Sequence, residues 1–392
     1  MKLTALKFII LIIFTLPGIL TANCGSEKKQ TGKTITDKKL YNWPIYRGDA
    51  QLSGVATTML PEKLQRIWSF KTGDEIKSSP IVGSGLVFIG SCDGKIYALD
   101  IETGKKKWEF NTESVVEAPP LLLEKTLYTG TLDGDLVALK ASNGEFLWKY
   151  KTDGKITGSA NWYSLAENKT TLILVGSYDS KMHCINSETG KPVWVYDTKN
   201  FINGSPAVYD KCVIFGGCDA LLHRVSITDG KNLVKIEMDS YVAASPGILG
   251  NRAFVGNYDG QFICVDLIEK KIVWYYEALD EGAAFFSSPA IGKNCIVIGS
   301  RDGRVHCVDK QSGKRIWTFL TQGDVDSSPV ICGDKVVAAS GDGRLYILSL
   351  IDGTEIWSYE IGEFISSSPA IVGDKIIIGS DDGTVYAFGI KQ

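Results

Sequence analysis

The chain has 392 residues, of which 44% are hydrophobic and 22% are charged, so it is long enough to bury a large core or two separate cores. Its formal net charge is −3, and a chain without a basic excess is not a typical nucleic-acid-binding protein. The sequence contains neither a P-loop nor a Gly-x-Ser-x-Gly motif, so these two catalytic motifs do not indicate a function.

Residues 1–23 are predicted to be a secretory signal. A lysine at position 2 is followed by the apolar stretch FIILIIFTLPGIL and then by TANC, which ends at Cys24. The apolar stretch is short for a membrane span and contains a proline. A cysteine directly after it resembles a bacterial lipobox, which implies that Cys24 is lipidated; plain secretion and an uncleaved anchor are the alternatives. Residues 24–41 are polar and are predicted to form a flexible tether.

A repeat of about 40 residues fills the remainder of the chain. Tryptophan recurs at this spacing, with Val234 in its place once, at positions Trp68, Trp108, Trp148, Trp194, Trp274, Trp317 and Trp357. A proline marks the same units at Pro80, Pro120, Pro206, Pro246, Pro289, Pro329 and Pro369. The unit without the proline has Ala160 there and carries an insertion around SLAENKT. Eight units are therefore expected.

Each unit contains four short segments rich in Val, Ile, Tyr and Phe, which in the first unit read SSPIVG, LVFIGS, KIYALD and KKWEF. Asp-Gly between two apolar segments favours a tight hairpin because Gly accepts positive φ. The sequence thus predicts an all-β fold over residues 42–392, an eight-bladed β-propeller of four-stranded antiparallel blades. The last unit has only three strands, and the strand around Trp68 has no unit before it. We expect this N-terminal strand to complete the last blade and close the ring.

The segment ALDIETGKKKW at residues 98–108 resembles the tryptophan-docking motif of the PQQ-type (quinoprotein-like) repeat propellers. Looser copies end at Trp148, Trp194 and Trp317, and NWPIYRGDAQLSG from Asn42 is similar to the lead-in of that family. The resemblance implies that the tryptophans pack between neighbouring blades.

The resemblance also bounds the function. The enzymatic branch of the family uses a vicinal disulfide, a calcium site and a catalytic Asp around its quinone cofactor, whereas this chain has no Cys-Cys pair and the repeats use up its length. We therefore expect no enzymatic activity, no cofactor and no metal.

The signal, Cys24 and the tether resemble the lipid-anchored branch that acts in outer-membrane protein assembly. That branch implies a monomeric scaffold on the periplasmic side of the envelope, held at the outer membrane, whose partners are envelope proteins such as an assembly complex. The loops that correspond to that branch's partner-binding pattern, Leu-x-Leu-Arg-Gly-Glu-Ser-Ala-Pro, read NFINGSP and SYVAASP here. Another periplasmic binding propeller and a PQQ-dependent dehydrogenase stay open as alternatives.

Several polar residues that could suggest a site have a simpler interpretation. His183, His223 and His306 occupy one repeat position in three different blades, so we interpret them as strand residues and not as metal ligands. Most cysteines after Cys24 also occupy repeat positions, which are too far apart for disulfides, and we expect buried thiols. The Asp-Gly pairs are interpreted as turns rather than calcium loops.

Positions that change from unit to unit are the candidates for specific contacts. The most variable segment precedes the proline. In the family that this chain resembles, the innermost strand of each blade begins there, at the rim of the channel. The candidate partner-binding rim is Lys77, Glu117, Phe201, Asn203, Tyr241, Phe285, Phe286, Asp326 and Phe364. We expect a charged sector around Lys77 and an apolar sector in blades four to six. The alternative is that the aromatic rings fold inward and close the channel mouth.

Overall fold

The computed structural model describes residues 42–166 and 169–391. The predicted signal, Cys24 and the tether lie outside this range, and the predicted insertion in the third unit lies partly outside it. Within the described residues no helix is long and apolar enough to cross a membrane.

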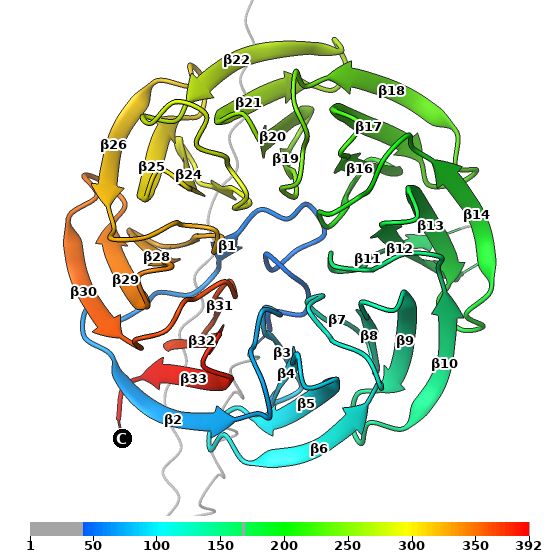
Figure 1. The fold of residues 1–392 in the computed structure, drawn as a ribbon, viewed down its shortest axis with the longest axis horizontal. Helices are drawn as coiled ribbons and strands as arrows, with labels where there is room; N and C mark the ends of the chain where they lie inside the picture. Colours follow the sequence, from blue (N-terminus) through cyan, green and yellow to red (C-terminus); the bar gives the residue numbers. More distant parts are fainter. Residues whose placement is uncertain (1–41, 167–168, 392) are drawn as a thin grey trace, which may run out of the picture. The chain divides into compact units, whose positions relative to one another are not determined.

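The described residues form eight sheets around a central axis, as Figure 1 shows. The strands of each blade run antiparallel from the channel outward, as in the first blade. The innermost strands are β3 (Ile81–Gly83), β7 (Leu121–Leu123), β11 (Asn161–Leu165), β15 (Ala207–Tyr209), β19 (Gly247–Leu249), β23 (Ala290–Ile291), β27 (Val330–Cys332) and β31 (Ala370–Val372). The second strands are β4 (Leu86–Gly90), β8 (Thr126–Gly130), β12 (Thr170–Ser177), β16 (Cys212–Gly216), β20 (Arg252–Gly256), β24 (Cys295–Ser300), β28 (Lys335–Ala339) and β32 (Lys375–Ser380).

The third and outer strands complete the blades. The third strands are β5 (Lys95–Asp100), β9 (Asp135–Lys140), β13 (Lys181–Asn186), β17 (Leu221–Ser226), β21 (Gln261–Asp266), β25 (Arg304–Asp309), β29 (Arg344–Ser349) and β33 (Thr384–Gly389). The outer strands are β6 (Lys106–Asn111), β10 (Phe146–Lys151), β14 (Pro192–Asp197), β18 (Asn232–Glu237), β22 (Lys271–Glu277), β26 (Arg315–Leu320), β30 (Glu355–Glu360) and, for the eighth blade, β2 (Gln65–Lys71). The predicted eight-bladed propeller is confirmed.

The ring closes as the sequence predicts. Strand β2 pairs antiparallel with β33, and Trp68 lies opposite Ala387. The last blade therefore consists of three C-terminal strands and one N-terminal strand, which removes an open sheet edge at the seam.

The tryptophans join each blade to the next one. Six of the seven donate their indole N–H to a backbone carbonyl of the following blade; the donors are Trp68, Trp108, Trp148, Trp194, Trp274 and Trp317. Their rings lie on a turn glycine, and a Cβ built on Gly104 would come within 2.6 Å of the Trp68 ring. At the interface of blades four and five, Val234 replaces the tryptophan and Lys270 takes the glycine position with φ 57°. The smaller Val234 side chain is compatible with a Cβ at this position.

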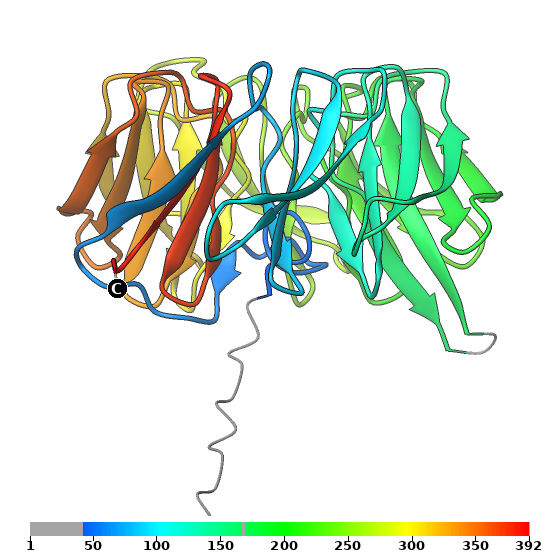
Figure 2. The same ribbon diagram turned by 90° about the horizontal axis from the view of Figure 1, so that it is seen from below.

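A segment before the first blade closes one end of the channel, which the sequence did not predict. This plug segment, residues 43–58, crosses the centre of the ring in Figure 1 and lies toward the lower face in Figure 2. Its carbonyls accept hydrogen bonds from the innermost strands of six blades, through the backbone N–H groups of Val82, Leu122, Val208, Ile248, Ile291 and Ile331. Near its end, the two-residue strand β1 (Val55–Ala56) pairs in parallel with β27.

Arg47 holds the plug segment from within. Its side chain is only 1% exposed and donates hydrogen bonds to the carbonyl oxygens of Ser328, Pro289 and Pro329 at 3.0, 2.9 and 2.6 Å. Burial lowers the pKa of Arg47 from 12.5 to about 10, and the charge of Asp49 partly offsets this. The plug segment is thus tied to blades six and seven by a buried cation.

Candidate functional site

The channel is open at the end opposite the plug segment. There it forms a cavity of about 180 Å³ whose lining includes Tyr46 of the plug segment. One residue from every blade lines it at the position three before the repeat proline; these residues are Lys77, Glu117, Thr157, Asn203, Ala243, Phe286, Asp326 and Ser366. We call this open end the mouth.

A ring of serines forms the wall of the cavity below these residues. The backbone N–H of the serine before the proline donates to the hydroxyl of the equivalent serine in the next blade, as Ser205 does to Ser245 at 2.8 Å. Six such hydrogen bonds run from blade three through blade eight to Ser79 of the first blade. The second blade has Pro119 at this position, and proline has no N–H to donate. The ring fixes the spacing of the blades around the cavity.

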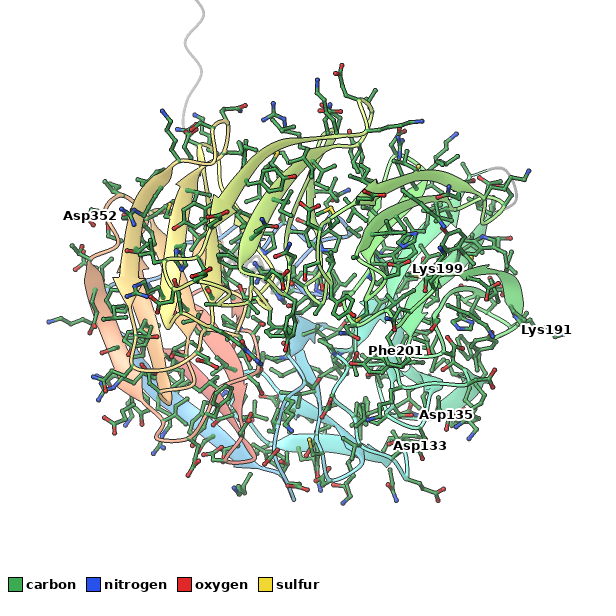
Figure 3. The ribbon with its side chains drawn as sticks, turned by 45° about the horizontal axis from the view of Figure 1, so that its top comes forward. Asp133, Asp135, Lys191, Lys199, Phe201 and Asp352 are labelled. Carbon is green, nitrogen blue, oxygen red and sulfur yellow. The ribbon has the colours of Figure 1, made fainter. Side chains whose placement is uncertain are left out.

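Backbone hydrogen bonds bring two chain segments together at the mouth of each blade. The residue before the turn Asp donates its N–H to the residue five before the proline, as Tyr258 does to Tyr241 at 2.9 Å. The connecting segments between blades and these turns consequently share one face of the ring, the upper edge in Figure 2. In Figure 3 the side chain of Phe201 lies toward the centre of the ring, whereas Lys191 lies at its outer edge.

Aromatic side chains gather at the mouth over blades three to six. The ring of Phe201 stacks on Tyr178 with centroids 5.0 Å apart, and Tyr258 contacts Tyr241 and Phe286 at 6.5 and 5.6 Å. Phe201, Tyr241 and Tyr258 remain 45%, 53% and 51% exposed. We call these five residues the aromatic arc. The exposure of Phe201, Tyr241 and Tyr258 disfavours the alternative in which these three rings fold inward to close the channel.

The charged candidates lie on the other side of the mouth and are partly paired. The ammonium of Lys77 lies 3.1 Å from the Glu75 carboxylate and 3.9 Å from that of Glu117. The hydrogen bond with Glu75 raises the pKa of Lys77. Asp326 pairs with Arg301 at 2.8 Å.

Phe285 does not belong to the rim, contrary to the sequence prediction. It is 1% exposed and packs on Phe262 and on Gly256, where a Cβ would come within 2.2 Å of it. The position four before the proline is a buried blade contact throughout, filled elsewhere by Ile or Val, as by Val116 against Gly90. Because side chains alternate in this extended segment, its neighbour Phe286 lines the mouth.

The two remaining candidates also lie at the mouth. Phe364 is 36% exposed, and its ring lies over Gly341 of the seventh blade. The amide of Asn203 donates to the Cys218 sulfur at 3.5 Å, and its carbonyl oxygen is buried without a hydrogen-bond partner among the described residues.

The sequence analysis did not predict three residues that lie at the mouth. Tyr178, Tyr258 and Arg301 all precede a turn Asp, a position that varies between blades as much as the predicted rim does. The same comparison between blades, applied to that position, could have found them.

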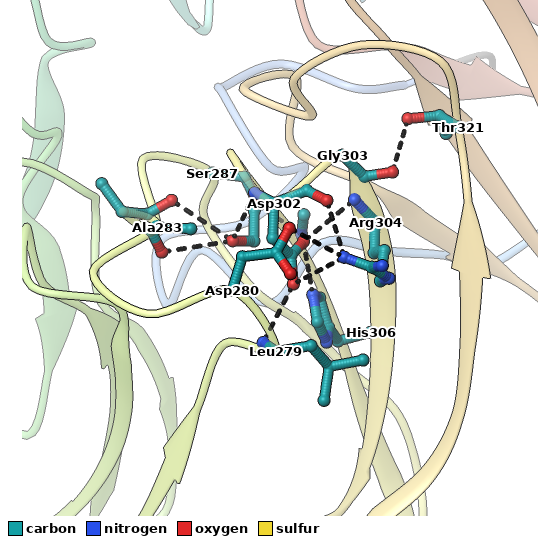
Figure 4. Close-up of polar contacts among 12 residues, drawn as sticks. Leu279, Asp280, Ala283, Ser287, Asp302, Gly303, Arg304, His306 and Thr321 are labelled. Atoms are coloured by element: carbon teal, nitrogen blue, oxygen red, sulfur yellow. Dashed lines mark hydrogen bonds and ion pairs between the residues drawn. The ribbon is translucent and has the colours of Figure 1, made fainter.

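The three histidines connect neighbouring blades. The His306 ring hydrogen-bonds to the Asp302 carboxylate of its own blade at 3.0 Å (Figure 4). It also hydrogen-bonds to the Tyr276 hydroxyl of the previous blade at 2.8 Å. His183 and His223 make the same pair of contacts, with Asp179 and Tyr150 and with Asp219 and Tyr196. In the described residues no group of three His, Cys, Asp or Glu side chains is placed to hold a metal ion.

The cysteines of the described part are free thiols, and six of the eight are buried. Burial raises the pKa of Cys184 to about 12, so its thiol is unreactive near neutral pH.

Comparisons with known proteins agree with this architecture. A family model described as outer membrane protein assembly factor BamB matches residues 61–176, 166–233 and 215–388. The crystal structure of BamB from Moraxella catarrhalis aligns with a TM-score of 0.69 and 18% identity, covering 84% of this chain and 98% of that one. A europium-containing methanol dehydrogenase aligns with a TM-score of 0.75 and 13% identity, covering 89% and 98%.

A quinohemoprotein alcohol dehydrogenase from Comamonas testosteroni gives a TM-score of 0.72 at 14% identity, with 90% and 81% covered. No curated protein matches the sequence. At these identities the solved structures share the fold alone, whereas the family model spans most of the repeats. The chain therefore belongs to the PQQ-repeat β-propeller family described as outer membrane protein assembly factor BamB.

Proposed function

We propose that this protein is a non-enzymatic scaffold that binds an envelope protein through the mouth of its channel, in a BamB-like role in outer-membrane protein assembly. The observation that carries the proposal is the contrast between repeated and variable positions. The buried positions, the serine ring and the docking tryptophans recur from blade to blade because they build the ring. The position three before the proline has a different residue in every blade, and the mouth includes exposed aromatic side chains, which are typical of protein-binding surfaces.

The charges at the mouth favour a binding surface over a PQQ-dependent dehydrogenase. Pyrroloquinoline quinone carries three carboxylates and needs cationic groups around it. Two carboxylates, Glu117 and Asp326, line the cavity, and its one lysine, Lys77, is already paired with Glu75 and Glu117. The residues present do not fit an anionic quinone, which supports a role without this cofactor.

The proposal includes a lipid anchor at Cys24 and a place on the periplasmic side of the outer membrane. Asn42, the first described residue, lies beside the plug segment on the face opposite the mouth. An anchor attached to this end of the chain would leave the mouth accessible. Replacing Cys24 by Ser should abolish incorporation of labelled palmitate and release the protein from membranes.

Site-specific photocrosslinking tests the binding surface. A photoreactive amino acid at Tyr241, in the aromatic arc, should yield an adduct with an envelope protein in intact cells, and mass spectrometry should identify an assembly component. Ile351 is the matched control because it is 79% exposed in the turn between β29 and β30, on the opposite face. An adduct at Ile351 with none at Tyr241 would contradict the proposal.

A further inference from the structure

Negative charge is concentrated in one half of the mouth. The connecting segments that lead into blades seven, eight, one and two contain seven carboxylates and a single base, Lys77. The other four connecting segments contain four carboxylates and two lysines. We call the seven carboxylates, with that of Asp381 in the adjoining turn, the acidic sector; its members are Asp74, Glu75, Glu113, Glu117, Asp324, Asp326, Glu363 and Asp381.

The protein's own cations neutralise only part of this sector. Lys77 pairs with Glu75 and Glu117, and Arg301 pairs with Asp326 and, at 3.9 Å, with Asp324. The other four members make no ion pair among the described residues; they are Asp74, Glu113, Glu363 and Asp381. The connecting segments of this half contribute seven acids and one base, so negative charge remains in excess after these ion pairs form.

At one place in the mouth, neighbouring side chains bind the guanidinium of the protein's own Arg301. The guanidinium carbon of Arg301 lies 4.0 Å from the centroid of the Phe286 ring, and its nitrogens donate to the Asp326 carboxylate at 2.8 and 3.0 Å. The cation is thus held between an aromatic face and a carboxylate.

In the next blade an aromatic ring lies at the mouth with no cation stacked on it among the described residues, and this ring comes from another repeat position than Phe286. Gly341 occupies the repeat position of Arg301 and contributes no side chain, and the half-exposed ring of Phe364 lies beside it. Glu363 is adjacent to that ring in the chain, and the backbone of Asp381 donates its N–H to the Phe364 carbonyl at 3.0 Å.

Charges of both signs act on the Asp381 carboxyl at this place. Burial raises the pKa of this carboxyl and the charge of Glu75 raises it further, whereas the hydrogen bond from the Ser366 hydroxyl at 2.7 Å and the charge of Lys77 lower it. An added positive charge would offset the repulsion from Glu75.

We propose that the segment which docks in the mouth is basic, with an Arg or Lys side chain entering the acidic sector against the Phe364 ring. Apolar residues of the same segment pack on the aromatic arc, on the opposite side of the mouth. This inference rests on the proposed function and specifies the chemistry of the partner. It assigns Phe364, Glu363 and Asp381 as the residues that recognise the cation.

A defined peptide tests the proposal with the full-length protein in detergent. The probe is a fluorescent peptide of Gly-Arg-Phe repeats, compared with peptides in which citrulline or Glu replaces Arg. By fluorescence anisotropy we expect the Arg peptide to bind roughly tenfold more tightly than the citrulline peptide, and the Glu peptide not to bind. Raising salt from about 50 to about 300 mM should weaken the Arg peptide several-fold.

Variants locate the site. E363Q, D381N and F364A should each weaken the Arg peptide several-fold, whereas E188Q, an exposed change in the turn between β13 and β14 on the opposite face, should not. Because Glu363 is exposed, E363Q keeps the test valid even if D381N unfolds the blade. Equal binding of Arg and citrulline peptides, or equal loss in E188Q, would overturn the inference.

The outcome can be separated from that of the proposed function. If Tyr241 crosslinks to an envelope protein and the Arg peptide neither binds nor competes, the scaffold role stands and the basic partner is wrong. If the Arg peptide binds at the acidic sector and no envelope adduct forms, the recognition chemistry stands and the scaffold role is wrong.

Discussion

Replacing Arg47 by Met should release the plug segment while leaving the blades intact. The guanidinium makes three hydrogen bonds to backbone carbonyls at 2.6 to 3.0 Å. A charge-assisted bond contributes about 1.5–3 kcal/mol, so together they stabilise the fold by roughly 5–9 kcal/mol. Burial of the charge opposes this, because the pKa lowered from 12.5 to about 10 corresponds to about 3 kcal/mol. The difference predicts a loss of roughly 2–6 kcal/mol.

Two measurements check this value. Guanidinium denaturation followed by tryptophan fluorescence gives the free energy of unfolding, and hydrogen exchange reports on the amides of Val208 and Ile331, which donate to the plug segment. Both amides should exchange faster in R47M. Arg315 is exposed on β26, so R315M should change neither quantity. An unfolding free energy for R47M within about 1 kcal/mol of the parent, with protected amides, would refute the assigned role of Arg47.

Two further predictions concern the contacts between blades. Replacing Gly313 by Ala should lower the thermal midpoint and reduce the free energy of unfolding by roughly 2–4 kcal/mol, because the added Cβ would lie 2.6 Å from the Trp274 ring at a residue with φ 69°. Replacing Gly250 by Ala is the control. This residue has φ 59° and open space around it, so the change should reduce the free energy of unfolding by about 1 kcal/mol. At Asp302, burial acts to raise the carboxyl pKa, but the hydrogen bond and charge of His306 outweigh it and hold the pKa below its ordinary value. A lowered folded-state pKa stabilises the protein above the unfolded-state pKa of about 4, and this contribution is lost as the pH falls further. D302N should therefore be less stable than the parent near neutral pH and lose less stability between about pH 5 and pH 2. Urea unfolding at a series of pH values measures this loss. If the free energy of unfolding falls equally in D302N and the parent as the pH is lowered, this carboxylate does not contribute.

Much of the architecture could be predicted from the sequence because each blade is a local pattern of strands and turns. The spacing of Trp68, Trp108 and their equivalents gives the number of blades, and the three-strand last unit requires β2 to close the ring. Even the replacement of Trp by Val234 has a local partner, since the glycine of the following unit is replaced by Lys270.

Other features depend on contacts that leave no periodic trace in the sequence. Residues 43–58 have no repeat, and the six strand amides that donate to their carbonyls come from six different blades, so the plug segment emerges only when the ring is assembled. By contrast, Phe285 could have been distinguished from its neighbour Phe286, because counting from Pro289 places it at the position that the other units fill with Ile or Val. The structure supplies the physical reason, which is the packing of Phe285 against Gly256 of the second strand.

The sequence by itself determined the fold, the closure of the ring and most of the positions that surround the channel, because those follow from patterns within one repeat. The tertiary structure decided how the mouth is composed, because the pre-turn residues Tyr258 and Arg301 meet Phe286 across turns distant in the chain. It also decided that the opposite end is closed. A side chain's exposure and its neighbours depend on the whole ring, and no single repeat contains that information.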